Sequence, residues 1–165
     1  MTRITSGGSF LLGTQSGTVN GLEWSTSPTL DKLGLFGGTT FYNGTNIRNS
    51  NTPAITTSTR ATGGASLNRT NTLQILSSAT PVTAFAPSSI GIGRTSTTNS
   101  TLANVGEVIV YPTELTGSAR SQVESYLAIK YGTTLDQTLA TNYILSNSSV
   151  AWSASNAGIF RNNIA

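Results

Sequence analysis

The stretch Val105–Leu135, VGEVIVYPTELTGSARSQVESYLAIKYGTTL, carries the clearest structural signals of the chain. Its short apolar run Val108–Tyr111 predicts a strand, which Pro112 ends because proline cannot donate to a β-ladder. A helix is predicted next, capped by Thr116 and stopped by Gly132, the residue that most readily adopts a left-handed conformation. The residues that repeat at helical spacing are Ala119, Val123, Tyr126, Leu127 and Lys130.

The composition is that of a single domain with few charges. The chain has 165 residues, 36% of them hydrophobic and only 9% charged, and Thr and Ser together contribute 50. Thr favours strands, whereas Ser, Gly and Asn favour turns. The solvation of such a chain depends mainly on hydroxyl and amide groups, a mixture typical of extracellular β proteins.

The sequence before and after this stretch predicts further strands. In FYNGTNIR, Asn43-Gly44 lies between strand formers and predicts a tight hairpin turn. In ASLNRTNTLQIL we expect two strands, joined by a turn longer than two residues because glycine is missing. Near the end, Asn142–Leu145 and Val150–Trp152 predict a terminal hairpin.

Short strands separated by turn signals predict an all-β protein, a sandwich or a barrel. We expect an antiparallel β-sandwich over residues 1–114, from which the first strands are missing. A helix over residues 115–132 would pack on this sandwich, and residues 133–165 would form a terminal hairpin that begins a following unit. On this view the chain is a piece of a longer protein.

The segments GEVIVY, VESYLAIKYG and TLDQT resemble the end of a laminin-G-like, or concanavalin A-like, jelly-roll domain. Such domains occur in large secreted surface proteins of adhesive and gliding Bacteroidetes, and the resemblance extends from Gly91 to about Trp152. It implies the jelly-roll strand order. It also implies a bacterial cell-surface or extracellular location, with a role in cell adhesion or recognition of glycans or other surface proteins.

Catalytic and metal chemistry find little support in the sequence. The chain has no His and no Cys, which excludes the usual Ser-His-Asp and Cys-His sets and makes a transition-metal site improbable. A glycoside hydrolase needs two carboxyl groups facing one cleft. No two acidic residues lie two or four positions apart; they are Glu23, Asp31, Glu107, Glu114, Glu124 and Asp136.

We therefore predict no enzyme activity, no catalytic residues and no cofactor. Calcium remains an alternative, because some laminin-G-like domains bind it through an Asp and backbone carbonyls, but only Asp31 and Asp136 are present here. The net charge of +3 comes from scattered basic residues, so we expect no nucleic-acid binding. No apolar stretch has the length of a membrane span, so we expect no transmembrane segment.

The predicted function is a non-catalytic module for adhesion or extracellular recognition, with carbohydrate as the ligand. Aromatic rings that could stack on a sugar are Trp24, Tyr42 and Trp152, although each also fits a packing role. Two alternatives stay open. One is a structural spacer or self-associating filament subunit without a ligand, and the other is a glycoside hydrolase-like enzyme.

Overall fold

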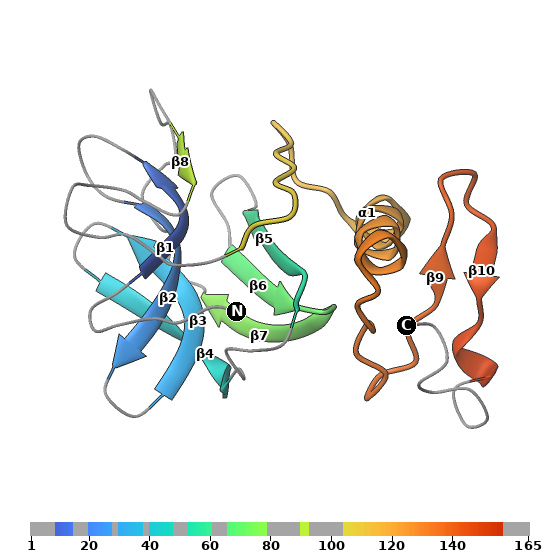
Figure 1. The fold of residues 1–165 in the computed structure, drawn as a ribbon, viewed down its shortest axis with the longest axis horizontal. Coiled ribbons are helices and arrows are strands. Elements are labelled where there is room, and N and C mark those ends of the chain that lie inside the picture. Colours follow the sequence, from blue (N-terminus) through green and yellow to red (C-terminus); the bar gives the residue numbers. More distant parts are fainter. Residues whose placement is uncertain are drawn as a thin grey trace. The chain divides into compact units, whose positions relative to one another are not determined.

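The structure is a computed structural model that describes residues 9–14, 20–27, 30–37, 40–47, 53–60, 66–78, 90–92 and 104–156. Its elements are shown in Figure 1. In chain order they are β1 (Ser9–Thr14), β2 (Asn20–Ser27), β3 (Leu30–Gly37), β4 (Thr40–Ile47), β5 (Thr56–Arg60), β6 (Ser66–Thr70), β7 (Leu73–Ser78), β8 (Ile90–Ile92), α1 (Gly117–Tyr131), β9 (Tyr143–Ile144), β10 (Val150–Trp152) and the 3₁₀ turn η1 (Ala154–Asn156).

The chain divides into two compact units. We call the first, within residues 1–52, 60–68 and 75–110, the strand unit. The second, within residues 53–59, 69–74 and 111–165, is the helical unit.

The strand unit contains a five-stranded sheet in the order β4-β3-β2-β1-β8. Strands β1 to β4 pair with their neighbours in sequence, all antiparallel, and β8 returns to pair with β1. Consecutive pairing of this kind is a meander, whereas a jelly roll is built from Greek-key connections.

The predicted all-β jelly-roll sandwich is therefore wrong. Besides the meander, the described residues contain a second sheet of three strands, β5-β6-β7, and a third of two, β10-β9. Ala128 of helix α1 belongs to the buried core of the helical unit.

Three local predictions also fail. Asn43-Gly44 lies inside β4, where the register with β3 shifts between Lys32 and Gly34, so the pair accompanies a β-bulge instead of a turn. The turn between β6 and β7 has only two residues, Asn71 and Thr72. Both have positive φ, +49° and +77°, as a two-residue hairpin turn requires even without glycine.

The predicted strand around Val108–Tyr111 is the third failure. Residues 104–111 are neither helix nor strand, and Val108, Ile109 and Val110 are 38%, 38% and 58% exposed. High β-propensity makes a strand only where a neighbouring strand supplies a ladder, and no described strand pairs with this segment.

The predicted helix is confirmed by α1. Thr116 occupies the N-cap position with extended backbone, although its side chain makes no capping hydrogen bond. Gly132 ends the helix with φ +61° and ψ +34°, and its N–H donates to the carbonyl of Ala128. The Tyr126 and Tyr131 side chains of this helix are 46% and 41% exposed.

The predicted terminal hairpin is present as the antiparallel pair β9 and β10. In Figure 1, β9 lies between α1 and β10. The core of the helical unit consists of Ile55, Ala128, Leu135 and Tyr143, against which Leu127 and Trp152 pack.

Tyr143 is the largest fully buried side chain of this core. Its ring meets Trp152 edge to face, with the centroids 5.7 Å apart, and its hydroxyl accepts a hydrogen bond from the Leu135 N–H at 2.8 Å. Burial raises the pKa of this hydroxyl. The side chain thus satisfies a backbone donor inside the core while it fills the space between the hairpin and the segment after α1.

We predict that Tyr143→Phe destabilises the chain by about 1–3 kcal/mol, because the buried Leu135 N–H loses its acceptor. Urea denaturation would measure the change. The control is Tyr111→Phe at a 46% exposed position, expected to change stability by no more than about 0.5 kcal/mol. Equal effects of the two changes would contradict the role given to the Tyr143 hydroxyl.

Candidate functional site

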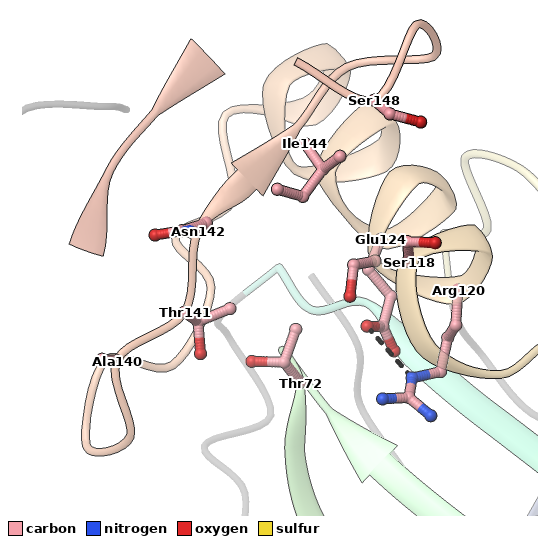
Figure 2. A pocket seen from close by; sticks show the side chains of 10 residues that line it. Thr72, Ser118, Arg120, Glu124, Ala140, Thr141, Asn142, Ile144 and Ser148 are labelled. Atoms are coloured by element: carbon pink, nitrogen blue, oxygen red, sulfur yellow. Dashed lines mark ion pairs between the residues drawn. The ribbon is translucent and has the colours of Figure 1, made fainter. Parts of the chain in front are cut away.

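The helical unit contains a hollow of about 440 Å³ that is open to solvent. It lies where the first turns of α1, the hairpin turn at Thr72 and the segment that leads into β9 come together (Figure 2). Eight of the ten residues that line it are polar or charged. It is lined by Thr72, Ser118, Arg120, Ser121, Glu124, Ala140, Thr141, Asn142, Ile144 and Ser148.

Asn71 positions the hairpin turn that carries Thr72. Its N–H donates to the Ile55 carbonyl at 2.8 Å, and its side-chain Oδ1 accepts from the Ile55 N–H, also at 2.8 Å. Its carbonyl accepts from the Asp136 N–H at 2.6 Å. One residue therefore joins the segment before β5, the β6–β7 turn and the segment after α1.

The terminal hairpin of β9 and β10 is held against α1 by two side chains of the helix. The Ser125 hydroxyl, fully buried, accepts from the Ile144 N–H at 2.9 Å. The Gln122 amide donates to the Ser148 hydroxyl at 3.0 Å and to the Ser146 carbonyl at 3.3 Å. These bonds fix Ile144 and Ser148 at the edge of the hollow.

Two lining residues have an unusual backbone. Only three non-glycine residues of the described segments have positive φ, and Thr72 at +77° and Ser148 at +67° are two of them. A β-branched residue adopts this conformation rarely and at a cost. Strained backbone concentrates at binding and catalytic sites, so this coincidence marks the hollow as a candidate site.

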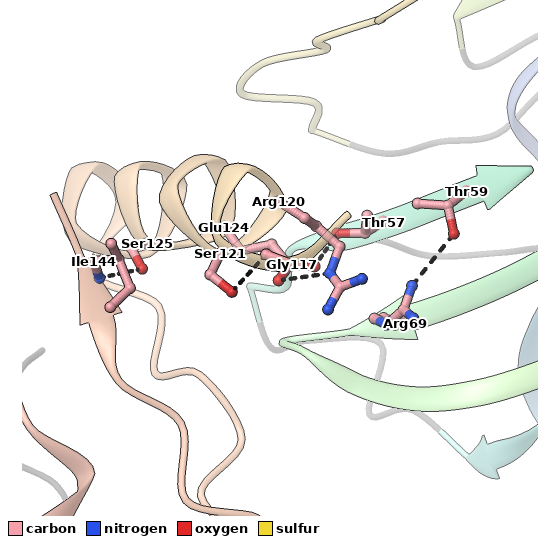
Figure 3. A network of polar contacts seen from close by, with 9 residues as sticks. All are labelled: Thr57, Thr59, Arg69, Gly117, Arg120, Ser121, Glu124, Ser125 and Ile144. Carbon is pink, nitrogen blue, oxygen red and sulfur yellow. Dashed lines mark hydrogen bonds and ion pairs between the residues drawn. The ribbon is translucent and has the colours of Figure 1, made fainter. Parts of the chain in front are cut away.

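Glu124 is the acidic group of the wall, and it is only 3% exposed. Its Oε1 accepts a hydrogen bond from the Thr57 hydroxyl at 2.8 Å, and its Oε2 lies 3.6 Å from the Arg120 Nε (Figure 3). Burial raises the pKa of this carboxyl, against the opposing effects of the Thr57 hydrogen bond and the charges of Arg120 and Arg69.

Arg69 is a second guanidinium of the helical unit and, unlike Arg120, is buried, with 8% of its surface exposed. Its Nη1 donates to the Thr59 hydroxyl at 3.3 Å. Burial and the charge of Arg120 lower its pKa, whereas Glu124 and Glu114 act in the opposite direction. Two guanidinium groups thus interact electrostatically with the same buried carboxyl.

The three aromatic residues predicted from the sequence do not line the hollow. Trp24 lies in β2 opposite Leu33, and Tyr42 lies in β4 opposite Leu35. Trp152 packs beside Tyr143 in the core of the helical unit. Their contact with a sugar stays a prediction.

The residues that do line the hollow were missed at the sequence level. A signal existed for Glu124, because it lies three and four positions before Leu127 and Ala128 and therefore on the inward face of the predicted helix. A carboxyl on that face is unusual. Nothing in the sequence indicated that Thr72 or Asn142 would lie near it.

Metal binding and membrane insertion gain no support here. The described residues hold no group of three or more Asp, Glu, His or Cys side chains placed to share a metal ion. Of the helices that the structure describes, none combines the length and apolar character needed to cross a bilayer.

One family model matches the chain, a domain of unknown function (DUF8202), over residues 119–165. The match covers less than a third of the chain, most of α1 and everything after it. Neither the curated proteins nor the solved structures contain a match. The resemblance to laminin-G-like surface modules stays a prediction.

We predict that the stability of the chain depends on pH through Glu124. Because the pKa is raised in the folded state, the proton is held more tightly there than in the unfolded chain. The stability that Glu124 contributes is therefore greatest below its ordinary pKa of 4.5 and falls as the pH rises through the folded-state value.

Urea denaturation of the wild type and Glu124→Gln across the acid range would test this. The stability of the wild type relative to the variant should decrease with rising pH. Glu114→Gln, which removes a carboxyl outside the hollow, serves as the control. A relative stability that increases with pH would mean that the ion pair with Arg120 outweighs burial.

Proposed function

We propose that this chain is a non-catalytic recognition module of a secreted or cell-surface protein, and that it binds carbohydrate in the hollow of the helical unit. The observation that carries the proposal is the wall of the hollow. Five of its lining side chains bear hydroxyl groups, and Asn142 adds an amide.

A saccharide suits this wall because each sugar hydroxyl can both donate and accept a hydrogen bond, as Ser, Thr and Asn groups also can. Ser118 is exposed, and its hydroxyl has no hydrogen-bond partner among the described residues. The Asn142 Oδ1 accepts from the Ala154 N–H at 2.7 Å, which fixes the orientation of its amide group. The hollow therefore combines a fixed amide with adaptable hydroxyls.

A non-catalytic role is favoured over the glycoside hydrolase alternative by the carboxyl groups. Hydrolysis of a glycosidic bond needs an acid and a base or nucleophile on opposite sides of that bond. Glu124 is the one carboxyl among the residues that line the hollow, and it is buried against Thr57 and Arg120. Glu124 can therefore hold Arg120 and Thr57 in position, but it has no second carboxyl among the lining residues with which to cleave a glycosidic bond.

A surface location fits the composition, since hydroxyl-rich and weakly charged chains are common among extracellular proteins. An open hollow without an aromatic ring would bind a single sugar weakly. Repetition of the module in a long surface protein would compensate through avidity.

A structural, self-associating module is the second candidate. It is favoured by the run Val105–Tyr111, whose apolar side chains are 38–58% exposed. A segment of high β-propensity can add to the edge of another sheet, so such a run could link subunits.

A glycan-array screen of the wild type and the double variant Ser118→Ala/Ser121→Ala would test the proposal. Alanine favours the helix, so the variant should fold, while it lacks two hydroxyls of the wall. We expect binding to one class of sugar that falls about tenfold in the variant. Ser155→Ala, an exposed hydroxyl outside the hollow, should bind like the wild type.

Light scattering on the same samples separates the two candidates. A monomer that binds sugar supports recognition. An oligomer or filament that binds no glycan on the array would overturn the proposal of carbohydrate recognition in favour of the structural role.

A further inference from the structure

Arg120 is the one cationic side chain among the residues that line the hollow. Its side chain is one-quarter exposed, and its Nε lies 3.6 Å from the Glu124 Oε2, too far for a hydrogen bond. The Nε is itself buried and has no hydrogen-bond partner. The guanidinium therefore reaches the hollow with donors that the described residues leave unused.

Buried donors without acceptors are costly, and they are rare in native proteins. In Figure 2 the Arg120 side chain extends from α1 beside Glu124, whereas Thr72 comes from the turn between β6 and β7. A ligand in the hollow would meet the partly exposed end of the guanidinium and not the buried Nε, so its acceptor would pair with the Nη groups.

The local charge favours an anionic acceptor. Arg120 and Arg69 both interact with Glu124, and Arg120 also acts on Arg69 by charge repulsion. Glu114 adds only a weaker attraction for Arg69. The single negative charge of the Glu124 carboxyl is thus shared between two guanidinium groups, those of Arg120 and Arg69.

We propose, building on the proposed function, that the hollow selects saccharides that carry a carboxylate, as uronic acids do, and that Arg120 binds this group. The planar guanidinium presents parallel N–H donors whose spacing matches the two oxygens of a carboxylate. The hydroxyls of Ser118 and Thr72, on the two sides of the hollow, bind the ring hydroxyls.

Calorimetric titration of the whole chain with trigalacturonic acid and with its methyl ester tests this selectivity. The two ligands share their rings and hydroxyls and differ in charge. We expect the acid to bind about tenfold more tightly than the ester, the difference that a charge-assisted hydrogen bond makes. A sulfated galactose trimer, included as a third ligand, shows whether the site accepts another anionic group.

Two variants assign the effect to Arg120. Arg120→Gln should bind acid and ester alike, at the weak affinity of the ester. Lys130→Gln removes one positive charge from the last turn of α1, outside the hollow, and should keep the full preference for the acid. Circular dichroism verifies that each variant is folded.

The outcomes separate this inference from the proposed function. Equal binding of acid and ester by the wild type would overturn the role of Arg120 and leave carbohydrate recognition intact, as would tighter binding of the sulfated trimer than of the acid. Binding of no ligand, here or on the glycan array, would overturn the proposed function as well. If Arg120→Gln does not fold, the comparison of acid and ester on the wild type decides alone.

Discussion

The helical unit depends on the hydrogen bonds of Asn71. This residue exchanges two hydrogen bonds with the backbone of Ile55 and accepts a third from the Asp136 N–H. The three segments that it joins are far apart in sequence. Because the left-handed backbone of the turn aims these groups, replacing the turn by a longer loop would separate the segments.

The core and the hollow both follow from this connection. Ile55 enters the core beside Tyr143 and Leu135, and Thr72 is brought to the hollow as the next residue of the turn. Helix α1 then serves two purposes along one face. Ala128 packs in the core, while Arg120 and Glu124 provide the charged part of the wall.

The helix could be predicted from the sequence because its signals are local. Thr116 and Gly132 lie at its ends, and the left-handed backbone of Gly132, which ends the helix, depends only on neighbouring residues. The terminal hairpin could be predicted for the same reason. The two-residue turn at Asn71 could not, because Thr72 adopts a conformation that β-branched residues disfavour and that the surrounding hydrogen bonds enforce.

The pairing of the strands and the residues of the hollow could not be predicted from local sequence signals. The run Val108–Tyr111 has the composition of a strand, yet pairing is decided by which segment lies next to it. The hollow combines Thr72 with residues of α1 and of the segment before β9, and no spacing in the sequence links them. The expected jelly roll failed because a resemblance in short segments does not determine the order of strands.

The central claim is that the turn at Asn71, the segment after α1 and the helix form one cooperative unit that shapes the hollow. Native-state hydrogen exchange of the amides of Asn71, Leu135, Asp136 and Ala128 tests it most directly. All four should exchange slowly and with a common dependence on denaturant, as groups that open together do. Fast exchange at Asn71 and Asp136 beside a protected Ala128 would contradict the claim, since the hollow would then lack a fixed wall at Thr72.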